Sequence, residues 1–129
     1  MSGVDIGIMP FSKMMGVEIT NASEEGVTGT LKVRPDLCTS RQIIHGGAIM
    51  AFADALGAIG ATFSLPEGAS GTTTLESKTN FIRGANEGTT VLGVTSPVHI
   101  GRRSSVWQTK ISREDGKTVA VVTQTQLVL

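Results

Sequence analysis

Residues 43–61 read IIHGGAIMAFADALGAIGA, and the central element of the fold can be predicted from them. From Gly46 to Phe63 the only charged side chain is Asp54, which stands among Ala, Ile, Met, Phe and Leu. The run is about long enough to cross a bilayer, but an Asp near its centre would add roughly 2.5 to 3.5 kcal/mol to the insertion free energy. We therefore predict a buried helix, and a helix that is apolar all round needs cover on nearly every side.

The segments on either side of this helix read as β-strands. A short helical turn over Met9 to Met15 precedes two short strands around a turn at Asn21 to Gly26, and Pro35 ends the second strand. Short glycine-bearing connections, typical of antiparallel neighbours, then separate four β-rich runs. These runs are Thr72 to Arg83, Thr90 to Ile100, Ser104 to Arg113 and Thr118 to Val128. Alternation in the last run predicts that one face carries Val119, Val121, Thr123, Thr125 and Leu127.

The order of these elements predicts an α+β fold in a single domain over residues 1–129. One antiparallel sheet with one long helix is the simplest packing of two strands, a helix and four strands. A curved sheet covers one face of the helix, which leaves the other face for a second copy of the chain. The sequence therefore predicts a symmetric dimer.

The composition excludes several classes of function. Eleven basic and eleven acidic residues cancel, so the broad positive surface of a general nucleic-acid binder is not expected. Two histidines, His45 and His99, and one cysteine do not make a metal-ligand cluster. Cys38 has no partner for a disulfide, and the N-terminal residues do not resemble a signal peptide. We expect a cytoplasmic protein that does not associate with membranes.

The His45-Gly46-Gly47 turn begins the helix and is the first half of a candidate site. The first amides of a helix lack intrahelical acceptors and lie at the positive end of its dipole. An N–H at Gly46 or Gly47 is therefore suited to polarise a carbonyl oxygen. Asp54 is the second half, but eight residues of helix place it about 12 Å from Gly46. Two antiparallel helices across a two-fold axis bring the halves together, which predicts two equivalent sites per dimer.

The sequence also allows purely structural roles for Asp54, His45 and the two glycines. Asp54 alternatively caps or pairs with a structural partner, while the glycines merely begin the helix. The His45 ring is suited equally to orienting the turn and to a catalytic role.

Four features of the sequence resemble those of a known family. They are the HGG turn, the acid seven residues after it, the strand TTTLESKTNFIRGA and the strand around GRRSSVWQTKI. From about Phe11 onward the chain resembles hotdog-fold acyl-CoA thioesterases of the phenylacetate-degradation type, within the 4-hydroxybenzoyl-CoA thioesterase superfamily. This resemblance implies a curved antiparallel β-sheet wrapped around one long central helix, and dimers that often pair into tetramers. It also implies hydrolysis of an acyl-CoA thioester without a metal or redox cofactor.

The resemblance assigns roles to four residues. Gly46 matches the glycine whose amide polarises the thioester carbonyl, and His45 matches a histidine near the thioester. Asp54 matches the acid that acts as general base or nucleophile, and the sequence leaves these two roles open. Thr74 matches a hydroxyl that helps to position water near the acid.

The chain also departs from the family pattern. Thr39 stands where an Asn is common, Gln42 where a Gly is usual, and Gly84 where many members have Pro. We expect the substrate-binding loop to differ, with Gln42 supplying the missing amide. The phosphates of coenzyme A call for cations, for which the candidates are Arg83, Arg102 and Arg103 with Ser104. The expected lining of the acyl site is Ile49, Met50 and Phe81.

Two other functions fit the same scaffold. One is a non-catalytic sensor or carrier of acyl-CoA. The other is hydration or dehydration of an acyl thioester, although enzymes of that kind pair a His and an acid in other local motifs.

Overall fold

The computed structural model describes residues 3–129 and contains one long helix, one short helix and eight strands. The helices are α1 (Pro10–Met15) and α2 (Gly46–Phe63). The strands are β1 (Glu18–Ser23), β2 (Gly26–Lys32), β3 (Cys38–Thr39), β4 (Ile43–Ile44), β5 (Thr72–Phe81), β6 (Thr90–Ile100), β7 (Ser104–Ser112) and β8 (Thr118–Val128). Single 3-10 turns cover Ile6–Ile8, Pro35–Leu37 and Ser40–Gln42. Within the described residues, the predicted helix and all six predicted strands are present.

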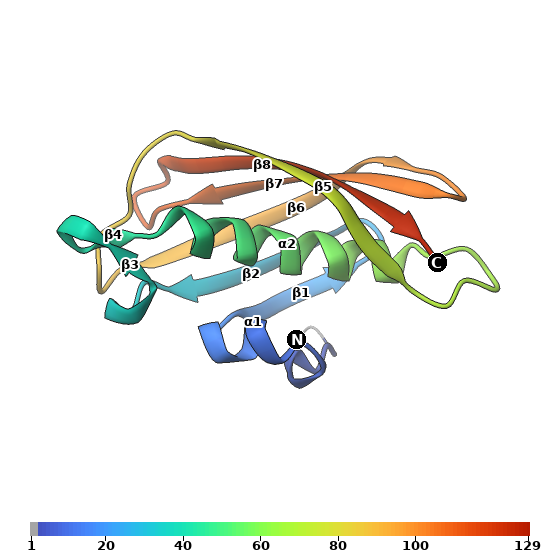
Figure 1. Cartoon of the computed structure of the whole chain (residues 1–129), viewed down its shortest axis with the longest axis horizontal. Helices are drawn as coiled ribbons and strands as arrows, with labels where there is room; N and C mark the ends of the chain where they lie inside the picture. The colour runs from blue at the N-terminus through green and yellow to red at the C-terminus, as the bar shows by residue number, and fades with distance from the viewer. Residues whose placement is uncertain (1–2) are drawn as a thin grey trace.

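Six strands form one antiparallel sheet in the order β1-β2-β6-β7-β8-β5 (Figure 1). Every pairing in it is antiparallel. The short connections after β6 and β7 join sheet neighbours as predicted, but the connection between β5 and β6 does not, because β7 and β8 lie between those two strands. Strand β5 follows α2 in the chain but joins the sheet at the far edge, beside β8. Strands β1 and β5 are therefore the two edges, and β3 and β4 form a separate small pair at the start of α2.

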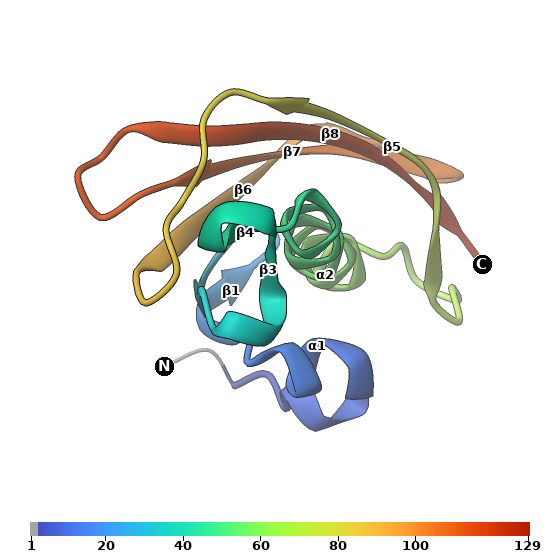
Figure 2. The same ribbon diagram turned by 60° about the vertical axis from the view of Figure 1, so that its left-hand side comes forward.

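Helix α2 lies in the hollow of the curved sheet, and α1 packs on its other side (Figure 2). Half of its eighteen residues are buried, so this helix, which is long and apolar enough to cross a membrane, is the central core helix of the domain. Two of its glycines permit the close approach of the sheet. A Cβ atom at Gly60 would press on the ring of Trp107, and one at Gly57 would overlap the amide of Gln124.

One stripe of α2 is not covered by the central strands and lies beside the edge strand β5. It contains Gly47, Ala51, Asp54, Ala58 and Thr62, which recur at the spacing of a single helix face. All five are half-buried or exposed in the single chain. The sheet thus covers one side of α2, while α1 and the N-terminal segment cover the other side only in part.

Two further details of the predicted strands are wrong. The turn between β1 and β2 is confined to Glu24 and Glu25, since β1 continues to Ser23. In β8, Val119 leaves the predicted face because the register shifts there: Ile111 pairs with Ala120 and Ser112 with Thr118. The extra residue is a β-bulge, which turns Val119 into the core. Simple alternation does not anticipate such an insertion.

A curved antiparallel sheet around one long helix is the architecture that the resemblance implied. The structure therefore confirms the hotdog fold.

Candidate active site

His45 is the N-cap residue of α2, and its side chain closes the first turn. Its Nδ1 accepts a hydrogen bond from the backbone N–H of Gly47 at 2.7 Å. The backbone N–H of His45 donates to the Leu37 carbonyl at 2.8 Å. A ring nitrogen that accepts carries no proton, so this hydrogen bond places the ring proton on Nε2. The structural role considered for His45 is therefore observed, and its catalytic role stays a prediction.

The amides of Gly46 and Gly47 differ in availability. The Gly47 N–H is taken by His45, whereas no acceptor within residues 3–129 pairs with the Gly46 N–H. Gly46 lines a hollow of about 350 Å³, with Ile44, Ile49, Phe81, Ile82, Arg83 and Gly84 as the other walls. Of the two amides that the sequence proposed, Gly46 is the one that remains open to a ligand.

Asp54 occupies a different hollow. The space measures about 340 Å³ and is also lined by Ala51 of the same helix and by Met9, Pro10, Phe11 and Ser12. Thr74 on β5 donates its hydroxyl to Asp54 Oδ1 at 2.6 Å. Neither ion pair found among residues 3–129 involves Asp54, so its partner is a hydroxyl rather than a cation.

Two residues that connect to this acid through Thr74 were not predicted from the sequence. Gln126 on β8 lies directly opposite Thr74 in the sheet register and donates to its hydroxyl at 2.7 Å. Gln126 also donates to Gln124 Oε1 at 2.6 Å, and Gln124 donates to the Ala53 carbonyl at 2.9 Å. The available signal was the Val-x-Gln-x-Gln alternation of residues 122–126, which places two amides on the buried face of a strand.

The inner face of β5 adds a row of hydroxyls to this region. Thr72 donates to Gln126 Oε1 at 3.0 Å and to the Leu127 carbonyl at 2.9 Å. Ser77 and Thr79 continue the row, and their buried hydroxyls have no partner in the described part of the chain.

The two halves of the candidate site do not meet within one chain. Gly46 and Asp54 belong to the same uninterrupted helix, so about 12 Å of helix separates them. They also open into separate hollows. The geometric premise of the two-chain site is therefore present in the structure.

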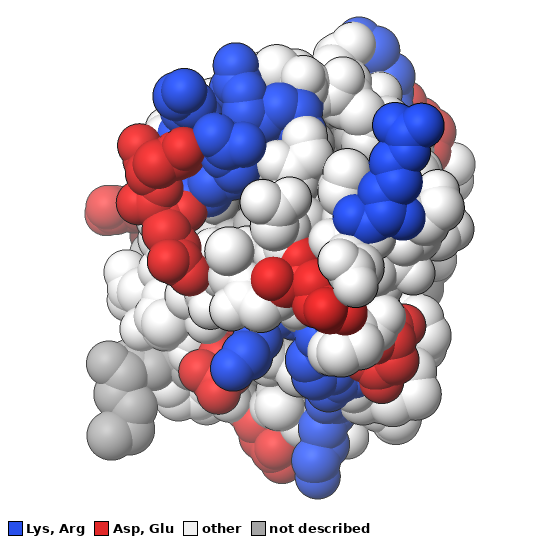
Figure 3. All heavy atoms as spheres, turned by 90° about the vertical axis from the view of Figure 1, so that its left-hand side faces the viewer, with Lys and Arg blue, Asp and Glu red and all other residues white. Residues whose placement is uncertain are grey.

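The predicted coenzyme A contacts lie at opposite ends of the molecule. Arg83 lines the Gly46 hollow, where its Nη1 donates to the Thr118 carbonyl at 2.8 Å. Arg102 and Arg103 lie in the turn before Ser104, at the end of the sheet where α2 finishes (Figure 1). On the opposite end, where α2 begins, basic side chains form separate groups with acidic side chains between them (Figure 3). Acidic side chains thus interrupt the positive surface of that end.

The loop before His45 has an unusual backbone. Arg41 and Gln42 have φ values of 65° and 59°, a left-handed conformation that glycine adopts without steric cost. The usual glycine of the resembling family falls at Gln42, which explains that preference in physical terms. The Gln42 carbonyl accepts from Glu87 N–H at 2.9 Å, while the side chains of Thr39 and Gln42 are exposed.

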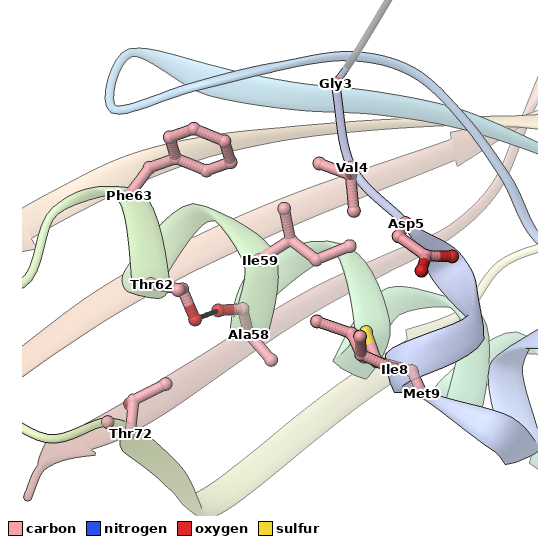
Figure 4. Close-up of a pocket in the computed structure, with 11 residues that line it drawn as sticks. Gly3, Val4, Asp5, Ile8, Met9, Ala58, Ile59, Thr62, Phe63 and Thr72 are labelled. Carbon is pink, nitrogen blue, oxygen red and sulfur yellow. Dashed lines mark hydrogen bonds between the residues drawn. The ribbon is translucent and has the colours of Figure 1, made fainter.

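An apolar pocket of about 490 Å³ begins one turn beyond Asp54 (Figure 4). Val4, Ile8 and Met9 of the N-terminal segment face Ala58, Ile59 and Phe63 of α2 across it, and Thr72 closes one side. Met9 lines both this pocket and the Asp54 hollow, so the two spaces adjoin.

Cys38 lies beside the His45 turn but is not an activated thiol. Partial burial raises its pKa, and the nearby carboxylates of Glu87 and Asp36 raise it further. The thiol donates weakly to the Arg34 carbonyl at 3.4 Å. Nucleophilic chemistry needs the thiolate, which this environment disfavours.

Comparison with known proteins identifies the family. A family model described as the thioesterase superfamily matches residues 41–120. The chain belongs to the thioesterase superfamily. This thioesterase is 39% identical to the 1,4-dihydroxy-2-naphthoyl-CoA hydrolase of Escherichia coli over 75 residues. The aligned residues make up 58% of this chain and 54% of that protein. The family and its relatives make the protein an enzyme, a thioester hydrolase.

Solved structures agree with this assignment. A Haemophilus influenzae thioesterase matches with a TM-score of 0.85 and 27% identity, over 92% of this chain and 82% of that chain. The Escherichia coli PaaI protein of the phenylacetic acid degradation operon matches with a TM-score of 0.84 and 20% identity, over 93% and 84% of the two chains. The second likeness shows the shared hotdog fold alone.

Proposed function

We propose that the protein hydrolyses an aryl or medium-chain acyl-CoA to the free acid and coenzyme A. In this proposal the Gly46 amide of one protomer polarises the thioester carbonyl, and Asp54 of the partner subunit acts as general base or nucleophile. The observation that carries it is Asp54: the lone charge of α2 faces a hollow and has a hydroxyl rather than a cation as its partner. The CoA thioester named for the Escherichia coli relative supports this substrate class.

The chemistry requires little more than these groups. A thioester has a good leaving group, so a donor at the developing oxyanion and an activated water suffice for hydrolysis. The open Gly46 N–H is suited to the first task and the Asp54 carboxylate to the second. An attack by Asp54 itself would proceed through a mixed anhydride, and both routes require the same two residues.

The shared site requires a dimer in which two α2 helices run antiparallel. The stripe of α2 around Asp54 lacks full cover in one chain, and the neighbouring edge strand β5 exposes Leu75, Phe81 and the adjacent Ile82. A second copy of the chain would cover both surfaces and bring its own Gly46 toward Asp54. Pairing of two dimers into a homotetramer stays a prediction from the family resemblance, to be tested by the solution mass.

The apolar pocket beyond Asp54 is our candidate for the acyl site. It adjoins the Asp54 hollow through Met9, and its volume of about 490 Å³ suits an aryl or medium-chain acyl group. Ile59 would thereby contact the acyl group, in addition to the residues Ile49, Met50 and Phe81 predicted at the other end of α2.

Three arginines remain candidates for binding the phosphates of coenzyme A. Arg83 shares a hollow with Gly46, whereas Arg102 and Arg103 with Ser104 would be reached from the partner's Gly46 turn. Thr39, Gln42 and Gly47 border the same turn. We also propose a cytoplasmic location, consistent with the single cysteine.

A panel of acyl-CoAs incubated with a thiol reagent tests the activity. Release of free coenzyme A, ranked by kcat/KM across aryl and aliphatic chains, is the expected result. Saturable binding of acyl-CoA without release of coenzyme A would instead indicate the sensor function and contradict the proposal.

Mixing two inactive variants tests the shared site. Gly46→Pro removes the backbone N–H at the first helical position, which proline tolerates, and His45 already has the extended conformation that a following proline requires. Gly46→Pro mixed with Asp54→Asn should regain about a quarter of the wild-type activity, because half of the randomly formed dimers contain one intact site. No recovery after verified subunit exchange would contradict a site built from both chains.

A further inference from the structure

Two glutamines that the proposed mechanism does not use lie next to the acid. Gln124 and Gln126 of β8 have 0% of their surface exposed. Buried amides are stable only when their donors and acceptors are paired, so glutamines in a core require partners. The missing side chain of Gly57 provides the space for the Gln124 amide against α2.

The direction of the hydrogen bonds is fixed at one end of this pair. The Ala53 carbonyl can only accept, so the group of Gln124 that faces it at 2.9 Å must be the NH₂. Gln124 Oε1 then faces Gln126, and only the NH₂ of Gln126 can donate to it at 2.6 Å. The orientation of both amides therefore follows from one backbone carbonyl.

This orientation determines where the Thr74 proton points. The same NH₂ of Gln126 donates to Thr74 Oγ1, so the single hydroxyl proton of Thr74 is left for Asp54 Oδ1. Oδ1 is thus occupied by a hydrogen bond. Asp54 Oδ2 has no hydrogen-bond partner within residues 3–129.

We infer that Gln126, oriented by Gln124, is a positioning residue that commits the Thr74 hydroxyl to Asp54 Oδ1 and leaves Oδ2 as the reacting oxygen. This inference rests on the proposed function, since it assigns the geometry of the same acid. A buried chain of hydrogen bonds, here called the relay, runs from the Ala53 carbonyl through Gln124, Gln126 and Thr74 to Asp54. The relay holds the carboxylate in one rotamer, so that the oxygen facing the hollow is always the same one.

The test is a double-mutant cycle on turnover. Gln126→Leu removes the donor to Thr74 while remaining apolar and similar in size. We expect kcat to fall about tenfold to a hundredfold with KM nearly unchanged, as for loss of a hydrogen bond that orients a charged group. In a Thr74→Val background the same change should alter kcat by less than about twofold, because the relay is already broken at Thr74.

A matched glutamine on the outer face of the sheet provides the control. Gln108 on β7 is exposed and donates only a long hydrogen bond of 3.4 Å to Thr123, so Gln108→Leu should leave kcat unchanged. Gln126→Glu repeats the test at equal volume if Gln126→Leu does not fold, because a carboxylate accepts the Thr74 proton instead of directing it to Asp54.

The outcomes separate this inference from the proposed function. An unchanged kcat in Gln126→Leu or Gln126→Glu, or a full loss that persists in the Thr74→Val background, overturns the inference alone. A wild-type protein that releases no coenzyme A from any acyl-CoA overturns the proposed function, and with it the inference.

Discussion

The acid half and the amide half of the candidate site are built in different ways. Asp54 accepts a hydrogen bond from Thr74 of β5, and Gln126 and Gln124 of β8 extend this largely buried set of hydrogen bonds to the Ala53 carbonyl of α2. The Gly46 turn is more exposed, and its one side-chain hydrogen bond is local, from the Gly47 N–H to the His45 ring. The first half is complete within one chain, while the second presents an unpaired N–H.

This difference indicates where each half obtains its precision. A carboxylate has two oxygens and rotatable bonds, so a fixed reacting geometry requires neighbours that hold it. A backbone N–H at a helix start is already fixed by the helix and needs only to be left open. We therefore expect distant substitutions to affect the acid half and local substitutions to affect the amide half.

The largest effect should come from Asp54→Asn. The amide oxygen still accepts from Thr74, so the fold is retained, but the base or nucleophile is lost. We expect kcat to fall about a hundredfold to ten-thousandfold in the acyl-CoA assay. Asp115→Asn is the control: Arg113 beside Asp115 lowers the pKa of that carboxyl to about 2, so the control also removes an ionised acid. Hydrolysis by Asp54→Asn at a near-normal rate would contradict the role of the acid half.

The next effect isolates the amide half. Gly46→Pro should lower kcat about a hundredfold to a thousandfold, the usual cost of one lost oxyanion donor. Gly46→Ala is the matched control, because its Cβ meets the Phe81 ring in the same way but the N–H remains. Equal kcat values for the two variants would show that the steric change, and not the amide, determines activity.

A substitution elsewhere in α2 should affect the acid half by displacing Gln124. Gly57→Ala would gain about 0.5 to 1 kcal/mol from helix propensity but lose about 1 to 3 kcal/mol by overlap with Gln124. Urea unfolding should therefore show a net loss of stability, and kcat should fall as the relay shifts. Gly60→Ala presses on Trp107 instead and should lose stability without losing kcat. If both variants lose kcat alike, the effect is general rather than transmitted by Gln124.

The loop beside the amide half allows a milder test. Gln42→Gly keeps the left-handed backbone that Gln42 already has and removes only the side-chain amide. We expect kcat/KM to fall about tenfold, as for one lost hydrogen bond, with thermal stability preserved. Gln42→Asn, which tolerates this conformation and keeps an amide, should lose less. Identical kinetics for wild type and Gln42→Gly would remove Gln42 from the substrate contacts.

The smallest effect belongs to Cys38, which lies near the amide half without taking part. Its raised pKa keeps the thiol protonated at neutral pH, so Cys38→Ser should change kcat/KM by less than about twofold. Alkylation of the wild-type thiol by iodoacetamide should be slow at pH 7 and accelerate as the pH rises toward the pKa. A large loss of turnover in Cys38→Ser would require a different nucleophile in the mechanism.

Much of the framework was accessible from the sequence because its signals are local. Apolar residues on all sides predicted the α2 helix, glycine-bearing connections predicted antiparallel strands, and a lone charge in an apolar run singled out Asp54. One error concerns topology, since β5 and β6 follow each other along the chain but do not pair. The other errors arose where a regular pattern is interrupted over a few residues. The bulge at Val119 and the tight turn at Glu24 and Glu25 are of this kind, and periodicity averages over such changes.

By itself, the sequence determined the central helix, the strand order along the chain and the separation of Gly46 from Asp54, since each depends on covalent neighbours and helix rise. The surroundings of the acid, in contrast, depend on how distant segments pack. Thr74 lies 20 residues from Asp54, and Gln126 a further 52 residues along the chain. They meet because β5 pairs with β8 in one register across the sheet, and such contacts between distant segments leave no periodic trace in the chain.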